Sequence, residues 1–219
     1  MYHLRNVIER HTLTAIVQAL SDADWHDGRL TAGWQARQVK YNEQIAEGSD
    51  VHQQLSDLVG SALSSSSTFL ALARPKSVLP FRFSRYSPGM EYGNHADDPV
   101  MSGIRTDLSI TVFLSEPESY QGGELVIEHA AGVEKVKLPA GDAIVYPSST
   151  LHRVEKVESG QRLVAVSWIR SLIRDHAARE ILLDLDLARQ GLFKQHGPSR
   201  DIDLLSKSLA NLTRMWVDD

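Results

Sequence analysis

The fold is decided by the stretch Leu108-Ser-Ile-Thr-Val-Phe-Leu114, in which four aliphatic residues alternate with Ser109, Thr111 and Phe113. Alternation with a period of two is typical of a strand that packs one face on a core. Similar short runs lie around it, at residues 81–86, 123–128, 136–138, 143–146 and 162–169. Turn residues separate them, as in Ser87-Pro-Gly89 and Pro139-Ala-Gly-Asp142. Many short strands with such turns predict an antiparallel sandwich or barrel, and a double-sheet jelly roll fits best.

Amphipathic helices are expected on both sides of these strands. Residues 12–23 and 51–72 carry apolar residues at helical spacing, and the run Ser64-Ser-Ser-Ser67 interrupts the second helix or lies near its end. Residues 25–34 resemble a loop. Two further apolar stripes cover residues 173–188, with Gly191 as the expected stop, and residues 202–216. This tail is too apolar to hang free, so we expect it to cap the sheet or to form a homodimer contact, with Trp216 buried.

The sequence therefore predicts an α+β chain that is mainly β, in three parts. Residues 1–79 form a mainly helical region packed on the core, residues 80–171 form the jelly-roll core, and residues 172–219 form a helical C-terminal extension. A chain of 219 residues, 42% hydrophobic and 23% charged, is large enough to enclose a site.

Composition excludes several classes of function. The net charge is −5 and no Lys/Arg-rich run occurs, which argues against nucleic acid as the main partner. There is no cysteine, so disulfides, cysteine zinc sites and iron–sulfur clusters are excluded. No apolar stretch approaches the ~20 residues that span a bilayer, and the charged N-terminus does not resemble a signal peptide. We expect a cytoplasmic protein without a membrane partner.

One set of residues stands out as a candidate metal site. His95 and Asp97 lie two residues apart in Tyr92-Gly-Asn-His-Ala-Asp-Asp98, and His152 lies in Pro147-Ser-Ser-Thr-Leu-His-Arg-Val154. Side chains at i and i+2 of an extended chain point to the same face, so one metal can bind both. Two imidazoles and one carboxylate form the facial triad of non-haem Fe(II) oxygenases.

Each of these residues also has a plain structural interpretation. His95 could be a loop histidine, Asp97 an Asx-turn residue and His152 a surface histidine, and each motif alone is weak. Their order along the strand series makes the joint signal strong. The other seven histidines, at positions 3, 11, 26, 52, 129, 176 and 196, lack such a context and receive no role.

Arg162 heads the apolar run Arg-Leu-Val-Ala-Val-Ser-Trp-Ile169. On a strand it shares a face with Val164 and Val166, where a buried arginine needs an anionic partner. A dicarboxylic co-substrate would supply that partner through a bidentate contact. The alternative places Arg162 at an exposed strand end, paired with Glu155 or Glu158.

The chain resembles the Fe(II)/2-oxoglutarate dioxygenases of the prolyl 4-hydroxylase type, and most closely the bacterial PKHD-type hydroxylases. The resemblance covers nearly the whole chain. The motifs that carry it are Phe83-Ser-Arg-Tyr-Ser-Pro-Gly-Met-Glu-Tyr92, His95-Ala-Asp97, Arg105-Thr-Asp-Leu-Ser-Ile-Thr-Val-Phe-Leu114, Tyr120-Gln-Gly-Gly-Glu-Leu125, Gly141-Asp-Ala-Ile-Val-Tyr-Pro147, Leu183-Asp-Leu-Asp-Leu-Ala-Arg-Gln190 and Asn211-Leu-Thr-Arg-Met-Trp216.

The resemblance implies a role for each site residue. His95, Asp97 and His152 would bind the iron, with no catalytic residue beyond these ligands. Arg162 would bind the C5 carboxylate of 2-oxoglutarate, and Tyr86 matches a tyrosine that touches the same carboxylate in relatives. Fe(II), 2-oxoglutarate, O₂ and L-ascorbate are the implied cofactors and co-substrates. The presence of a carboxylate ligand favours hydroxylation over halogenation.

Two rival functions stay open from the sequence alone. The first is a cupin-like metal-binding, ligand-binding or iron-sensing protein without turnover, although a cupin would show H-x-H rather than H-x-D. The second is a degenerate oxygenase fold that serves as a scaffold. The prime substrate, peptidyl or small-molecule, is not indicated by these residues.

Overall fold

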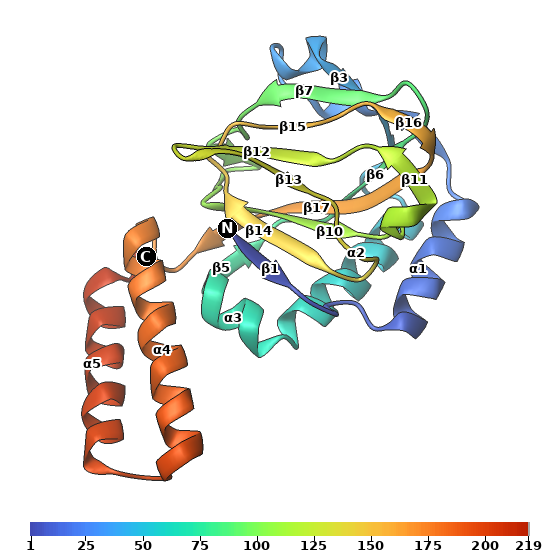
Figure 1. Cartoon of the computed structure of the whole chain (residues 1–219). Helices are drawn as coiled ribbons and strands as arrows, with labels where there is room; N and C mark the ends of the chain where they lie inside the picture. The colour runs from blue at the N-terminus through green and yellow to red at the C-terminus, as the bar shows by residue number, and fades with distance from the viewer. Residues whose placement is uncertain (219) are drawn as a thin grey trace.

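A computed structural model describes residues 1–218, and two antiparallel sheets form its body (Figure 1). The larger sheet has the order β1 (Tyr2–Leu4), β14 (Ala143–Pro147), β10 (Leu108–Phe113), β17 (Arg162–Ser171), β6 (Arg82–Tyr86), β4 (Glu43–Ile45) and β2 (Trp25–Asp27), with β5 (Pro75–Val78) also paired to β17. The smaller sheet has the order β13 (Gly132–Val136), β12 (Leu125–His129), β15 (His152–Val154), β7 (Glu91–His95) and β3 (Lys40–Tyr41). This double sheet is the predicted jelly roll.

Short elements connect these strands. Two further strand pairs are β11 (Tyr120–Gly122) with β16 (Val157–Gly160), and β8 (Val100–Met101) with β9 (Ile104–Arg105). Single turns of 3₁₀ helix are η1 (Gly28–Thr31), η2 (Ala36–Gln38) and η3 (Pro117–Ser119).

The alternation along β10 separates two apolar layers. Leu108, Ile110 and Val112 are buried in the cluster that includes the N-terminal helices. Phe113 is buried in a second cluster with residues of the smaller sheet, such as Leu125. The strand predicted from this stretch is therefore confirmed, and its two faces pack on different layers.

Helices α1 (Arg10–Ser21), α2 (Asp50–Ser64) and α3 (Ser67–Ala73) cover the outer face of the larger sheet (Figure 1). The predicted helix over residues 51–72 is in fact two helices. Its serine run breaks it, because the Ser66 side chain accepts a hydrogen bond from the Phe69 backbone N–H and so caps α3.

The N-terminal region also contains strands that the apolar pattern did not predict. β1, β2 and β4 extend the larger sheet, and β3 extends the smaller one. The prediction of a loop at residues 25–34 is wrong in part, because β2 and η1 lie there. The strand predicted at 136–138 is offset, since β13 ends at Val136.

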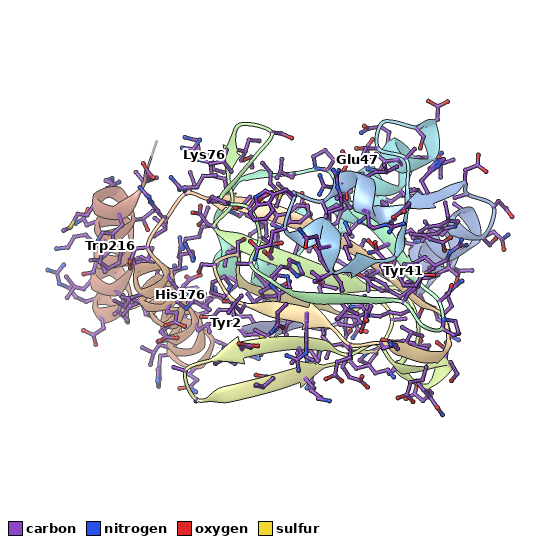
Figure 2. All side chains as sticks on the ribbon, turned by 90° about the horizontal axis from the view of Figure 1, so that it is seen from above. Tyr2, Tyr41, Glu47, Lys76, His176 and Trp216 are labelled. Carbon is purple, nitrogen blue, oxygen red and sulfur yellow. The ribbon has the colours of Figure 1, made fainter. Side chains whose placement is uncertain are left out.

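The C-terminal tail forms a hairpin of α4 (His176–His196) and α5 (Arg200–Trp216), which projects from the body (Figure 1). Gly191 does not stop α4, and the helix ends before Gly197, whose φ of 68° breaks it. Trp216 packs on the cluster of Ile173, Ala178 and Leu182 but is only partly buried, so the prediction of a buried tryptophan was too strong (Figure 2).

The hairpin is anchored at its base. Leu183 of α4 is buried in the main apolar cluster, and Arg105 pairs with Asp218 at 2.5 Å. Among residues 1–218, no helix is both long enough and apolar enough to cross a bilayer.

Candidate functional site

The three residues predicted to bind iron are brought together by strand pairing. β7 ends with His95, β15 begins with His152, and these two residues lie opposite each other in the antiparallel register. Their ring centroids are 4.2 Å apart. The Oδ2 atom of Asp97, two residues beyond β7, lies 3.9 Å from His152 Nε2. One potential ligand atom from each residue lies within 4.8 Å of the others, and no other group of three His, Cys, Asp or Glu residues among the described residues does so.

Hydrogen bonds orient both imidazoles toward the same point. His95 Nδ1 lies 2.8 Å from the Gly93 carbonyl oxygen, and His152 Nδ1 lies 3.0 Å from the Thr150 carbonyl oxygen. A carbonyl can only accept, so each Nδ1 carries the proton and donates it. The Nε2 atoms therefore keep free lone pairs, which is the tautomer that metal ligation requires.

The Asp97 carboxylate is held in the same way. Ser109 Oγ, on β10, donates to Asp97 Oδ2 at 2.5 Å and lies 2.8 Å from Ser148 Oγ. The backbone N–H of Asp97 donates to the Ser148 carbonyl oxygen at 3.3 Å. The carboxylate is thus fixed by a neighbouring strand rather than left free in its loop.

Packing keeps His95 in the form that can bind a metal. The Tyr92 ring stacks on the His95 ring, with centroids 3.7 Å apart and planes 16° from parallel. Burial, followed by the nearby His152 ring, lowers the pKa of His95 to about 4. The imidazole is therefore neutral at neutral pH, and a metal does not have to displace a proton from it.

Arg162 is buried in the same cavity, and it has no anionic partner among residues 1–218. Its side chain is 1% exposed, and its Nε atom has no hydrogen-bond partner among the described residues. The guanidinium carbon lies 5.0 Å from the Tyr86 ring centroid and 5.6 Å from the Phe113 ring centroid. Glu155, one of the alternative partners considered from the sequence, pairs with Lys135 instead. A buried cation in this state requires a negatively charged ligand.

Tyr86 lies opposite Arg162 in the pairing of β6 with β17, and burial raises the pKa of its hydroxyl. Together with His95, Asp97 and His152, these two residues line one cavity of about 470 Å³. Val164 and Val166 line it as well, so the face of β17 predicted from the sequence is the face that meets the cavity. The volume falls in the range of small-molecule sites.

Comparison with known proteins agrees with this geometry. Residues 81–170 match the model of the 2OG-Fe(II) oxygenase superfamily. A PKHD-type hydroxylase of Picosynechococcus sp. is 50% identical over 99% of this chain and 99% of its own length. A second, from Gloeothece citriformis, is 46% identical over the full length of both chains. The chain belongs to the PKHD-type hydroxylases.

This hydroxylase also shares its fold with solved structures of low sequence identity. A Pseudomonas putida prolyl-4-hydroxylase has a TM-score of 0.55 and 19% identity, and the match covers 78% of this chain and 91% of the other. A prolyl hydroxylase from Trichoplax adhaerens has a TM-score of 0.58 and 16% identity, over 77% and 82% of the two chains. At such identities the likeness concerns the fold alone. Family membership makes the chain a 2-oxoglutarate-dependent hydroxylase, and the family implies Fe(II), 2-oxoglutarate and O₂.

Sequence reasoning missed a set of polar residues that line the cavity of this hydroxylase from the N-terminal region. Lys40, Asn42 and Gln44 alternate along β3 and β4, and all three are buried. Their period of two is a strand signal, but here the inward-facing residues are polar. A search for apolar alternation therefore passes over them. Ser109, which holds Asp97, was seen only as the polar half of a strand pattern.

Proposed function

We propose that His95, Asp97 and His152 bind Fe(II), and that Arg162 binds the C5 carboxylate of 2-oxoglutarate with Tyr86 beside it. In this proposal the enzyme hydroxylates an organic substrate, peptidyl or small-molecule, while 2-oxoglutarate is decarboxylated to succinate. The observation that carries the proposal is the buried, unpaired Arg162 guanidinium in the same cavity as the three ligand residues.

The residues fit the metal in their donor chemistry. Two neutral imidazole nitrogens and one carboxylate oxygen suit Fe(II) and leave coordination positions for other ligands. Bound Fe(II) would supply the activation of O₂ that couples decarboxylation of 2-oxoglutarate to transfer of one oxygen atom to the substrate. Asp97, held by Ser109, supplies the one negative charge of the ligand set.

The chain's own contribution is positioning and exclusion of water. Arg162 would fix one end of 2-oxoglutarate by a bidentate, charge-assisted contact, which sets the other end at the metal. Leu125, Val154 and Val164 line the cavity with apolar surface and keep water from the bound co-substrate. Tyr92 keeps the His95 ring from rotating.

Binding of 2-oxoglutarate to the anaerobic Fe(II) protein tests this proposal. A 2-oxo acid that chelates Fe(II) gives a visible charge-transfer absorption, and we expect it to saturate at one 2-oxoglutarate per chain. His95→Ala should abolish the absorption, while His129→Ala, a histidine outside the cavity, should keep it. Equal absorption in both variants would reject the ligand assignment.

A cupin-like binding protein is the alternative function, and family membership favours the enzyme over it. Production of succinate from 2-oxoglutarate separates the two. We also propose a role for ascorbate in re-reducing iron oxidised in turnovers without substrate, and a cytoplasmic location in keeping with the absence of cysteine.

We further propose that the α4–α5 hairpin contacts a second copy of the chain. Its far half exposes several large apolar side chains, namely Leu187, Leu192, Phe193 and Leu204. Exposed apolar side chains of this kind suit an isologous dimer contact. Light scattering of the wild type and of Phe193→Glu tests it, because the variant should be monomeric if this face forms the dimer.

A further inference from the structure

Lys40 is a second buried cation in the active-site cavity, and the proposed binding of iron and 2-oxoglutarate does not use it. It begins β3 and lies opposite Tyr92 of β7. The residue is 6% exposed and lines the same cavity as the candidate iron ligands. The Lys40 Nζ atom lies 5.3 Å from the Tyr92 ring centroid, and the Tyr92 ring stacks on His95. The Tyr92 ring thus lies between the Lys40 ammonium group and His95, a candidate iron ligand.

The hydrogen bonds of Lys40 leave its charge unneutralised. Nζ donates to Thr31 Oγ1 at 2.9 Å and lies 3.4 Å from Gln44 Oε1. Both partners are neutral oxygens, and among residues 1–218 Lys40 forms no ion pair. An ammonium group has three donors, so one N–H remains for a ligand in the cavity.

These neutral partners are themselves held in place. Gln44 Nε2 donates to Ser84 Oγ at 2.9 Å, and the Thr31 hydroxyl donates to Gln44 Oε1 at 2.6 Å. The amide of Gln44 is therefore oriented with its oxygen toward Lys40. A network of this kind presents only acceptors to Nζ and fixes the ammonium group before any ligand binds.

Charges of both signs surround Lys40: Arg82 disfavours its charged form, whereas the carboxylates of Glu47, Asp27 and Asp97 favour it in part. Arg82 of β6 lines the same cavity, and its guanidinium carbon lies 5.0 Å from the Trp168 ring centroid. Its Nε pairs with the half-exposed Glu47. Burial, followed by Arg82, lowers the pKa of Lys40 to about 8. The charged form of Lys40 is thus costly at this buried position, and an anionic ligand would offset that cost.

We propose that Lys40 binds a carboxylate of the prime substrate, so that the substrates of this hydroxylase are carboxylic acids. The inference rests on the proposed function, in which Arg162 is already occupied by 2-oxoglutarate and Lys40 is left for the other organic ligand. The carboxylate can belong to a small acid or to an acidic side chain of a peptide. Trp34 and Trp168 also line the cavity and offer aromatic surface to the rest of such a molecule.

A binding measurement with matched probes tests the inference. The anaerobic Fe(II) protein, saturated with 2-oxoglutarate, is titrated with N-acetylglycine and with its amide, and tryptophan fluorescence reports binding. The two probes differ in the carboxylate alone. We expect the wild type to bind the acid about 10- to 100-fold more tightly than the amide, as a hydrogen bond to a charged group implies.

Variants assign the preference to one residue. Lys40→Met keeps the length of the side chain and removes the charge, so it should bind the acid and the amide equally. Lys76→Met changes an exposed lysine on β5 that does not line the cavity, so this variant should keep the wild-type preference. The wild-type comparison of acid and amide needs no variant, so equal binding of the two probes overturns the inference even if Lys40→Met folds poorly.

A parallel titration determines whether the bound carboxylate belongs to a small acid or to a peptide side chain. An acidic peptide with an amidated C-terminus that binds more tightly than N-acetylglycine assigns the carboxylate to a peptide side chain, and the reverse order assigns it to a small acid. The inference is overturned if acid and amide bind alike in the wild type, if neither binds, or if Lys40→Met keeps the preference. Absence of succinate formation in the wild type would instead reject the proposed function itself.

Discussion

Replacing Arg162 by methionine separates two effects of this buried charge, namely its effect on folding stability and its proposed contribution to 2-oxoglutarate binding. The guanidinium is 1% exposed and has no anionic partner among the described residues, so only the nearby Tyr86 and Phe113 rings offset its desolvation. Exchange of a buried ionic group for an apolar one of similar length is often neutral, or stabilising by about 1–4 kcal/mol. We therefore expect Arg162→Met to unfold at the same temperature as the wild type or higher, whereas most changes at buried positions destabilise.

The same substitution should remove most of the stabilisation by 2-oxoglutarate. At a concentration of 100 times Kd, a ligand stabilises the native state by about 2.7 kcal/mol, which for a chain of this size corresponds to a rise in Tm of roughly 5–10 °C. Loss of one partner of a buried charge pair costs about 2–5 kcal/mol, or at least about a 30-fold rise in Kd. At the same 2-oxoglutarate concentration, the stabilisation of the variant should fall below about 1 kcal/mol.

Thermal denaturation of the anaerobic Fe(II) protein, with and without 2-oxoglutarate, measures both effects. Arg170→Met is the matched control, because Arg170 is on the same strand but does not line the cavity. The reasoning is refuted if Arg162→Met keeps the full shift in Tm with 2-oxoglutarate. It is also refuted if the ligand-free variant loses several kcal/mol of stability, since the guanidinium would then have a structural partner.

Three further predictions follow from other parts of the structure. His152→Ala should weaken Fe(II) binding by about 10-fold or more, or at least ~1.4 kcal/mol, and an anaerobic titration that gives wild-type affinity would contradict it. Truncation after Ser171 should give aggregated or molten protein, because it removes Leu183 from the main core, and a soluble, active fragment of residues 1–171 would show that the tail is independent. The free energy of unfolding of the wild type, relative to that of Lys40→Met, should rise by up to about 3 kcal/mol between pH 8 and pH 10.5. In this range the lowered pKa leaves Lys40 neutral in the folded protein, whereas the lysine of the unfolded chain still binds its proton. Denaturant titrations in which the difference between the two proteins does not change with pH would exclude this.

The candidate site could be predicted from the sequence because its members lie on regular strands or, like Asp97, directly after one. His95 and His152 stand at the ends of β7 and β15, where the order of strands and turns fixes their approach. Arg162 occupies a position on β17 whose apolar neighbours imply burial. In each case the local sequence pattern predicts the strand, and the pairing of the strands brings the side chains together.

The parts that the sequence did not predict depend on contacts between distant segments. Lys40 and Gln44 received no role from the sequence, because only the pairing of β3 with β7 and of β4 with β6 turns these residues into a cavity wall. Gly191 resembles a helix end, yet α4 continues through it and ends before Gly197, which has a positive φ and is followed by Pro198. Trp216 is only partly covered, since it packs on the small cluster of Ile173, Ala178 and Leu182 and not in the main core.

Succinate formation from 2-oxoglutarate is the measurement that tests the central claim most directly. It should be followed in the wild type and in His152→Ala, with Fe(II) and O₂ supplied and then each withheld. The account predicts that the wild type forms succinate only when both are present, and that His152→Ala forms at most a small fraction of it. A wild-type protein that binds Fe(II) but forms no succinate, or a His152→Ala variant with the full rate, would contradict the account.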